Sequence, residues 1–215
     1  MVNLFVRAGI LTLLILTAWF LLSTALEGER NNTLLGKIDT VIAEEGAVDA
    51  YLEYIESTGD TQRYCEVLTE HIQKQNERLF PLLSLLDQAR QNGLQNDYST
   101  VRQRFQAANA KLYFSLKKFE YKCPESNALK QPILYFFPDG ANCNECLIQA
   151  QILNEIRDSC HQQIQIFAFP VEGGIEPVDL LVKDYSIEKT PSLVIGEKVY
   201  EGVQSKSTLN QLLAC

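Results

Sequence analysis

The pattern of apolar and polar residues divides the chain into an apolar leader, a helical stretch, and a stretch in which strands and helices alternate. Residues 8–26 contain no charged side chain. A helix of this length spans about 28 Å, close to the hydrocarbon thickness of a bilayer. We therefore predict that residues 1–28 form an N-terminal signal-anchor transmembrane helix. The alternative is a signal peptide that is cleaved near Ser23 and Ala25.

The charges that flank the leader predict its orientation. Arg7 precedes the apolar run, whereas Glu27 and Glu29 follow it. Positive charge is favoured on the inner side of a membrane. We therefore expect a single-pass membrane protein with a cytoplasmic amino terminus and soluble domains outside, in the periplasm or at the cell exterior. Cleavage of the leader would export the same domains.

Residues 29–123 have the pattern of a helical segment with three helices. From Leu34 to Ile55, apolar residues recur in alternating threes and fours, which is typical of a coiled coil, although Glu45 occupies one seam position. A second helical pattern follows from Cys65 and contains Pro81, which should kink it. The turn signal at 92–97 leads to a third helix, so the last two helices form an antiparallel hairpin. The segment is a candidate stalk, partner-binding surface or self-association element, the last of which would give a homodimer.

Two cysteines lie at matched distances from the tip of this hairpin. Taking Leu94 as the tip, Cys65 lies about 29 residues before it and Cys123 about 29 residues after it. The two side chains would meet at the open end of the hairpin, and we predict a structural disulfide between them. The alternative is a small apolar residue at Cys65 and a loop thiol at Cys123.

A linker at 124–132 precedes a region that reads as alternating strands and helices. The pattern predicts the order β-α-β-α-β-β-α. The expected strands lie at 133–137, 164–169, 192–195 and 199–202, and the expected helices at 143–160, 176–187 and 207–214.

The motifs of residues 131–215 resemble the thioredoxin-fold family of thiol-disulfide oxidoreductases. Cys143 and Cys146 stand where the first strand gives way to a helix, Thr190 and Pro191 lead into the third strand, and Gly202 ends the hairpin before the last helix. The resemblance implies a thioredoxin-like α/β domain in which Pro191 has a cis peptide bond. It also implies that Thr190 and Pro191 bind the substrate chain.

Two positions depart from the family pattern. Asn142 stands where the family commonly has Trp, and Phe137 stands where its reductases often bury an acidic residue. These departures weaken the interpretation as a cytoplasmic-type reductase.

The dithiol has the placement of a catalytic pair. A helix that begins at Cys143 points its free amide groups at that sulfur, which favours the thiolate and makes Cys143 the nucleophile. Cys146, one turn further on, would resolve the mixed disulfide. Asn144 and Glu145 between them should tune the redox couple, with the negative charge of Glu145 opposing thiolate formation.

Cys160 closes the first helix of the region and Cys215 closes the last. In a thioredoxin-like fold both helices cover the same face of the sheet, so their ends meet at its far edge. The resemblance therefore implies a second structural disulfide between them. The alternative is that both thiols are free, with Cys215 as a resolving thiol.

Charge and composition narrow the function further. The 215 residues carry a net charge of −8 and no basic patch, which disfavours a nucleic-acid partner. The two histidines, His71 and His161, are distant in sequence from the dithiol, so we expect neither a metal nor a cofactor. The sequence predicts a membrane-anchored, extracytoplasmic enzyme that exchanges disulfides with protein thiols and a redox partner. The alternative is a non-catalytic, membrane-anchored scaffold of the same fold.

Overall fold

A computed structural model describes residues 4–79, 82–84, 86, 95–125, 129–140, 142–160 and 164–213. Within these ranges the side chains of residues 4–8 and 95–97, and most of those at 24–45, are outside the description. The seam position Glu45, the expected kink at Pro81, the expected hairpin tip at Leu94, His161 and Cys215 are therefore not described.

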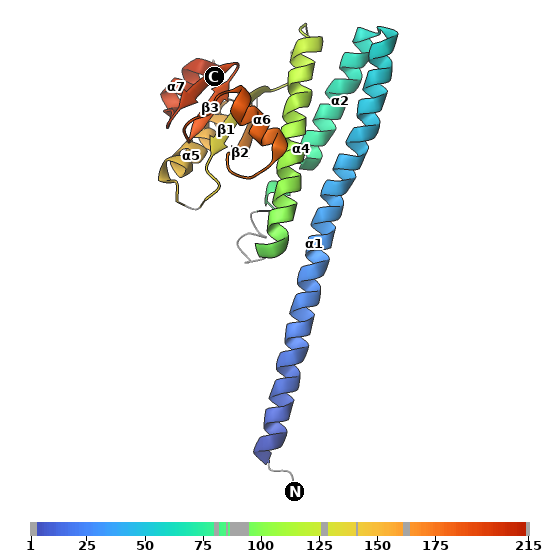
Figure 1. Cartoon of the computed structure of the whole chain (residues 1–215), viewed down its shortest axis with the longest axis vertical. Coiled ribbons are helices and arrows are strands. Elements are labelled where there is room, and N and C mark those ends of the chain that lie inside the picture. Colours follow the sequence, from blue (N-terminus) through green and yellow to red (C-terminus); the bar gives the residue numbers. More distant parts are fainter. Residues whose placement is uncertain are drawn as a thin grey trace.

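The amino-terminal part of the molecule contains the helices α1 (Leu4–Thr58), α2 (Thr61–Leu79) and α4 (Gln95–Lys122), with further helical residues at 82–84 and 86 (Figure 1). The turn between α1 and α2 follows from its sequence. Gly59 adopts φ of 75°, a left-handed conformation that glycine tolerates best and that ends α1. Asp60 then caps α2, because its carboxylate accepts a hydrogen bond from the backbone N–H of Arg63 at 3.0 Å.

The coiled coil predicted from the apolar pattern is not supported. Leu52 and Ile55 of α1 are buried in one cluster with Leu68 and Ile72 of α2 and with Leu112 of α4. The repeating apolar positions therefore serve packing among three helices of the same chain. Spacing in threes and fours suits both arrangements, which is why the pattern alone did not separate them.

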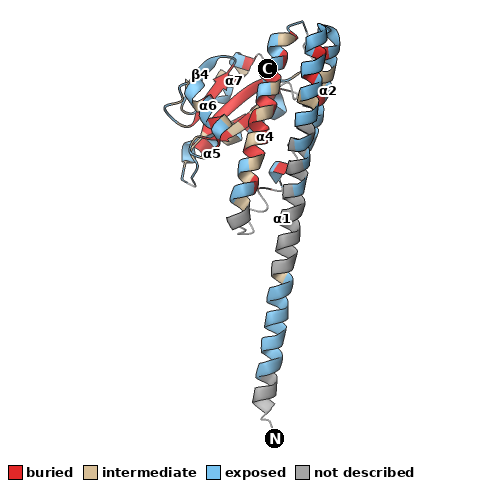
Figure 2. Cartoon of the chain, turned by 45° about the vertical axis from the view of Figure 1, so that its right-hand side comes forward, coloured by how far each residue is buried: buried red, intermediate tan, exposed pale blue. Residues whose placement is uncertain are grey.

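The transmembrane helix predicted for residues 1–28 is wrong. In the part of the chain that the structure describes, no helix is both long enough and apolar enough to cross a membrane. The apolar stretch lies within α1. The large apolar side chains in this stretch are exposed along the lower part of α1 (Figure 2). The single-pass membrane localisation that depended on this helix is overturned by the same finding.

The carboxy-terminal part forms one small mixed sheet. Its strands are β1 (Gln131–Phe137), β2 (Ile164–Pro170), β3 (Ser192–Ile195) and β4 (Lys198–Glu201), and they lie in the order β2-β1-β3-β4. β1 is parallel to β2 and antiparallel to β3, and β3 is antiparallel to β4. The helices are α5 (Asn144–Ser159), α6 (Glu176–Asp184) and α7 (Lys206–Leu213), so the element order is β-α-β-α-β-β-α.

The fold class expected from the sequence needs correction beyond the loss of its transmembrane helix. The part of the chain that the structure describes is mostly helical, and its small mixed sheet contains the four strands that the sequence pattern predicts. The physical reason is that the long helices are part of the same packed structure as the sheet.

The two faces of the sheet pack against different helices, because alternate side chains of a strand point to opposite faces. Ile133 and Tyr135 of β1 pack on one face with residues of α5 and α7. Leu134 and Phe136 pack on the other face, in the cluster that also holds the residues of α1, α2, α4 and α6. The helical part and this face of the sheet thus share one hydrophobic core, to which α1, α2, α4, α6, β1, β2 and β3 all contribute buried residues.

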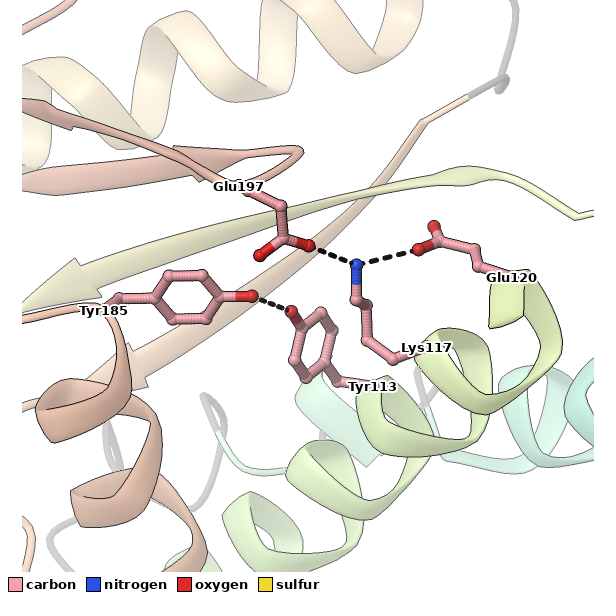
Figure 3. Close-up of polar contacts among 5 residues, drawn as sticks. All are labelled: Tyr113, Lys117, Glu120, Tyr185 and Glu197. Carbon is pink, nitrogen blue, oxygen red and sulfur yellow. Dashed lines mark hydrogen bonds and ion pairs between the residues drawn. The ribbon is translucent and has the colours of Figure 1, made fainter. Parts of the chain in front are cut away.

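Polar contacts join α4 to the same side of the sheet (Figure 3). The hydroxyls of Tyr113 and Tyr185 lie 2.6 Å apart, and burial, followed by this hydrogen bond, raises the pKa of Tyr113 well above its usual value. The Lys117 ammonium lies 2.7 Å from Glu197, in the turn between β3 and β4, and 2.9 Å from Glu120. Partial burial lowers the pKa of Lys117, but its bonds to the two carboxylates outweigh this and raise it. These contacts bind α4 to α6 and to the β3–β4 turn.

A disulfide between Cys65 and Cys123 joins the start of α2 to the end of α4, with Cα atoms 5.9 Å apart. It closes the open end of the helical hairpin, where the matched spacing of the two cysteines predicts it.

Replacing both Cys65 and Cys123 by Ala should lower the free energy of unfolding by about 4 kcal/mol. The bond closes a loop with a sequence separation of 58 residues, and the loss follows from the added chain entropy of the unfolded state. Urea unfolding of the oxidised protein and of the double variant measures the difference. Equal midpoints would show that the bond adds nothing to stability.

Candidate functional site

The cysteines at 143 and 146 meet at the amino-terminal end of α5, where they form a disulfide with Cα atoms 5.2 Å apart. Cys143 is the N-cap of α5, and its sulfur accepts a hydrogen bond from the backbone N–H of Cys146 at 3.1 Å. The free amides at this helix end carry partial positive charge, which favours a thiolate at Cys143 when the bond is reduced. Cys143 is half-buried, whereas Cys146 is only 7% exposed. An incoming group can therefore reach Cys143 more easily than Cys146.

Two buried polar residues, which the sequence analysis did not single out, hold the first turns of α5. The hydroxyl of Tyr135 on β1 donates a hydrogen bond to the backbone carbonyl of Cys146 at 2.8 Å. Burial raises the pKa of Tyr135 to about 12, so the phenol remains a donor over the physiological pH range. Gln149, which is fully buried, accepts a bond from the backbone N–H of Gln204 at 2.6 Å. The dithiol is thus fixed to the sheet and to the segment after β4.

The Thr190–Pro191 peptide bond is cis, and Pro191 lies directly before β3. Ser192 pairs with Phe136 in the antiparallel register of β3 and β1, so Pro191 lies at the carboxyl end of β1. The chain runs from that same end of β1 toward Cys143. The structure therefore places the proline loop and the dithiol at one end of the sheet. Pro191 is buried and Thr190 is half-buried, and the carbonyl of Pro191 accepts a bond from Gly202 at 2.7 Å.

The surface around the dithiol is mixed in character. Asn144 and Glu145 are exposed in the first turn of α5. Leu147 and Ile148 follow them and are 67% and 52% exposed, so apolar side chains also flank the half-buried sulfur of Cys143.

Of the other cysteines and histidines, the structure describes Cys65, Cys123, Cys160 and His71, and these lie on other parts of the fold. Cys160, at the end of α5, is buried and disulfide-bonded, and its expected partner Cys215 lies outside the described residues. His71 is buried in α2 beside Gln75, whose amide nitrogen lies 2.7 Å from its ring. Among the described residues, no group of three or more His, Cys, Asp or Glu side chains is placed to hold a metal ion.

Comparison with known proteins gives only distant structural neighbours. No protein family matches the chain, and no curated protein matches it. One solved structure that resembles it, a malarial protein, is 17% identical with a TM-score of 0.33, over 40% of this chain and 94% of that chain. Another, the chloroplastic thioredoxin z, is 15% identical with a TM-score of 0.34, over 46% of this chain and 86% of that chain. One distant structural neighbour is thus a thioredoxin. Structural similarity this low does not support a conclusion about function.

Proposed function

We propose that the protein is a thiol-disulfide oxidoreductase that acts on disulfides of other proteins through Cys143 and Cys146. One observation carries the proposal: two cysteines one turn apart at a helix end, the first half-buried and stabilised by a backbone amide, the second buried beneath it. This asymmetry suits a pair in which one sulfur attacks and the other resolves.

The reaction follows from this arrangement. The Cys143 thiolate attacks a substrate disulfide, which releases one substrate sulfur as a thiolate and forms a mixed disulfide. The Cys146 thiolate then attacks Cys143, which releases the second substrate sulfur and leaves the Cys143–Cys146 bond. The substrate gains two electrons and the dithiol loses two, so a partner dithiol must supply two electrons to restore the reduced pair. The reverse sequence oxidises a substrate dithiol.

The proposal extends to the residues around the pair. Thr190 and Pro191 bind the substrate chain, in keeping with their place at the same end of the sheet, and Asn144 and Glu145 set the reduction potential. Exchange with a disulfide-bonded protein, measured with the full chain and dithiothreitol as electron donor, tests the function. Absence of exchange would favour the alternative, a binding module in which the bond between the two cysteines is structural.

Replacing Glu145 by His should make the reduction potential more oxidising by at least about 30 mV, the shift that corresponds to about 1.4 kcal/mol for a two-electron couple. The change removes a negative charge beside the Cys143 thiolate and adds a group that favours it, which stabilises the reduced form. Equilibration with glutathione buffers measures the potential. The control Glu145→Gln, which removes only the charge, should shift it less, and an unchanged or more reducing value for Glu145→His would contradict the assigned role.

A further inference from the structure

The hydroxyl of Tyr135 joins the centre of the sheet to the backbone of the resolving cysteine. Tyr135 lies on β1, between Ala168 of β2 and Leu193 of β3 in the strand register. Its side chain is only 5% exposed, and its ring contacts that of Phe137 with centroids 5.4 Å apart. The strands on both sides and the neighbouring ring therefore fix the position of the phenol.

Both polar groups of the Cys146 backbone form hydrogen bonds at the dithiol turn. The N–H donates to the sulfur of Cys143 at 3.1 Å, and the carbonyl accepts from the hydroxyl of Tyr135 at 2.8 Å. The peptide group of this carbonyl also carries the N–H of Leu147, which donates to the carbonyl of Cys143 at 3.2 Å. A hydrogen bond to a carbonyl polarises its peptide group and strengthens the donor on the other side. The hydroxyl of Tyr135 is thus connected to Cys143 through two neighbouring amides.

These hydrogen bonds contribute more to the reduced form of the dithiol than to the oxidised form. In the oxidised protein the covalent bond between the two sulfurs also holds Cys143 at the turn. Reduction removes this constraint and allows the sulfur of Cys143 to carry a negative charge. A hydrogen bond to a charged acceptor is about twice as strong as one between neutral groups. A group that holds the Cys146 N–H in place consequently stabilises the reduced form.

We propose that Tyr135 is a positioning residue that stabilises the Cys143 thiolate through the backbone of Cys146 and makes the redox couple more oxidising. The inference rests on the proposed function, because it assigns the hydroxyl a role in the reactivity of the nucleophile. Because burial raises the pKa of Tyr135 to about 12, the phenol still donates its hydrogen bond when Cys143 ionises. Its effect is opposite to that of Glu145, whose negative charge opposes thiolate formation.

The test uses Tyr135→Phe in the full chain, which removes the hydroxyl and keeps the ring. The first readout is the pH profile of alkylation of Cys143 by iodoacetamide in the dithiothreitol-reduced protein, with the label located by peptide mass. Its midpoint should rise by about half a pH unit, which corresponds to a threefold loss of thiolate stabilisation. This is the lower end of the effect of one hydrogen bond, because the hydroxyl acts indirectly.

The second readout is the equilibrium between the dithiol and glutathione. In Tyr135→Phe it should shift about threefold toward the Cys143–Cys146 disulfide, which is a potential about 14 mV more reducing, since a tenfold change corresponds to about 30 mV.

The matched control is Tyr113→Phe, which also removes a buried, hydrogen-bonded hydroxyl. Tyr113 lies on α4, is 3% exposed, and its hydroxyl lies 2.6 Å from that of Tyr185. The control should lower the free energy of unfolding by a similar amount and leave the alkylation midpoint and the glutathione equilibrium unchanged. Equal shifts in the two variants would show a merely structural role for Tyr135. Either that result or unchanged readouts in Tyr135→Phe would overturn the proposal.

A measurement on the wild type does not depend on the folding of a variant. The NMR signal of the Tyr135 ring carbon that bears the hydroxyl should move with the midpoint of Cys143 ionisation in the reduced protein. It should stay constant over the same pH range in the oxidised protein. A constant signal in the reduced protein would contradict the coupling between the phenol and the thiolate.

The proposed function and the role of Tyr135 can fail separately. If the wild type exchanges no protein disulfide but Tyr135→Phe still raises the alkylation midpoint of Cys143, the role of Tyr135 stands and the oxidoreductase function fails. If exchange occurs and Tyr135→Phe has the wild-type midpoint and glutathione equilibrium, the function stands and the role of Tyr135 fails.

Discussion

Replacing Cys143 by Ser is expected to reduce disulfide exchange by at least about a thousandfold, the scale on which enzymes lose activity with their nucleophile. Cys143 is the half-buried member of the pair and accepts the hydrogen bond from the Cys146 amide, so the buried Cys146 cannot replace it in the first attack. The assay follows the reduction of a disulfide-bonded protein with dithiothreitol as donor.

The companion variant Cys146→Ser should form the mixed disulfide and stop there, because the resolving sulfur is gone. Mass spectrometry after alkylation should then find substrate attached to Cys143. The double variant Cys65→Ala with Cys123→Ala is the matched control for loss of a cysteine pair and should retain exchange. Wild-type activity in Cys143→Ser, with folding intact, would refute the assignment of the nucleophile.

Replacing Phe167 by Ala should destabilise the helical part and the sheet together, by about 3–5 kcal/mol. Phe167 on β2 is fully buried, and its ring contacts that of Tyr113 on α4 in an edge arrangement with centroids 5.6 Å apart. The side chain therefore supports both parts of the shared core. Hydrogen exchange measures the result, because amides in α2, α4, β1 and β2 should lose protection by the same free energy.

The control for this variant is Tyr54→Ala on α1, a side chain that is 61% exposed and should cost less than about 0.5 kcal/mol. Full protection of α2 and α4 in Phe167→Ala, alongside loss of protection in β1 and β2, would show two independent folding units. That result would contradict the shared core.

The sequence was informative where a local pattern determines the structure. Alternating apolar residues gave the order of strands and helices, and the matched distances of Cys65 and Cys123 from the hairpin turn gave a pairing that the structure contains. The sequence did not predict which element packs against a given apolar helix face. Spacing in the first helical pattern marks buried positions such as Leu52 and Ile55, but it does not say whether the partner is a second chain or another helix of the same chain.

The same ambiguity explains the missed core between α4 and the sheet. Leu134 and Phe136 belong to a strand with apolar residues on both faces. This pattern predicts that both faces are buried, but it does not identify the helix that covers each face. The wrong prediction for residues 1–28 also came from a local pattern. The length and lack of charge of the apolar run suggested a membrane-spanning helix.

Some supporting residues could have been found from their spacing. Gln149 lies on the same face of α5 as Cys146, Leu153 and Ile156, so its burial and its need for a hydrogen-bond partner could have been predicted from this spacing. Tyr135 had no such signal, because a tyrosine in a run of apolar strand residues reads as ordinary core.

The most direct test of the central claim is a redox titration of the full chain in glutathione buffers, with thiols trapped and located by peptide mass. The account predicts that Cys143 and Cys146 titrate reversibly, at a potential between about −120 and −270 mV, while Cys65 and Cys123 stay bonded. If the Cys143–Cys146 bond resists reduction below about −300 mV, as structural disulfides do, then it is a structural clip and the proposed catalytic function is wrong.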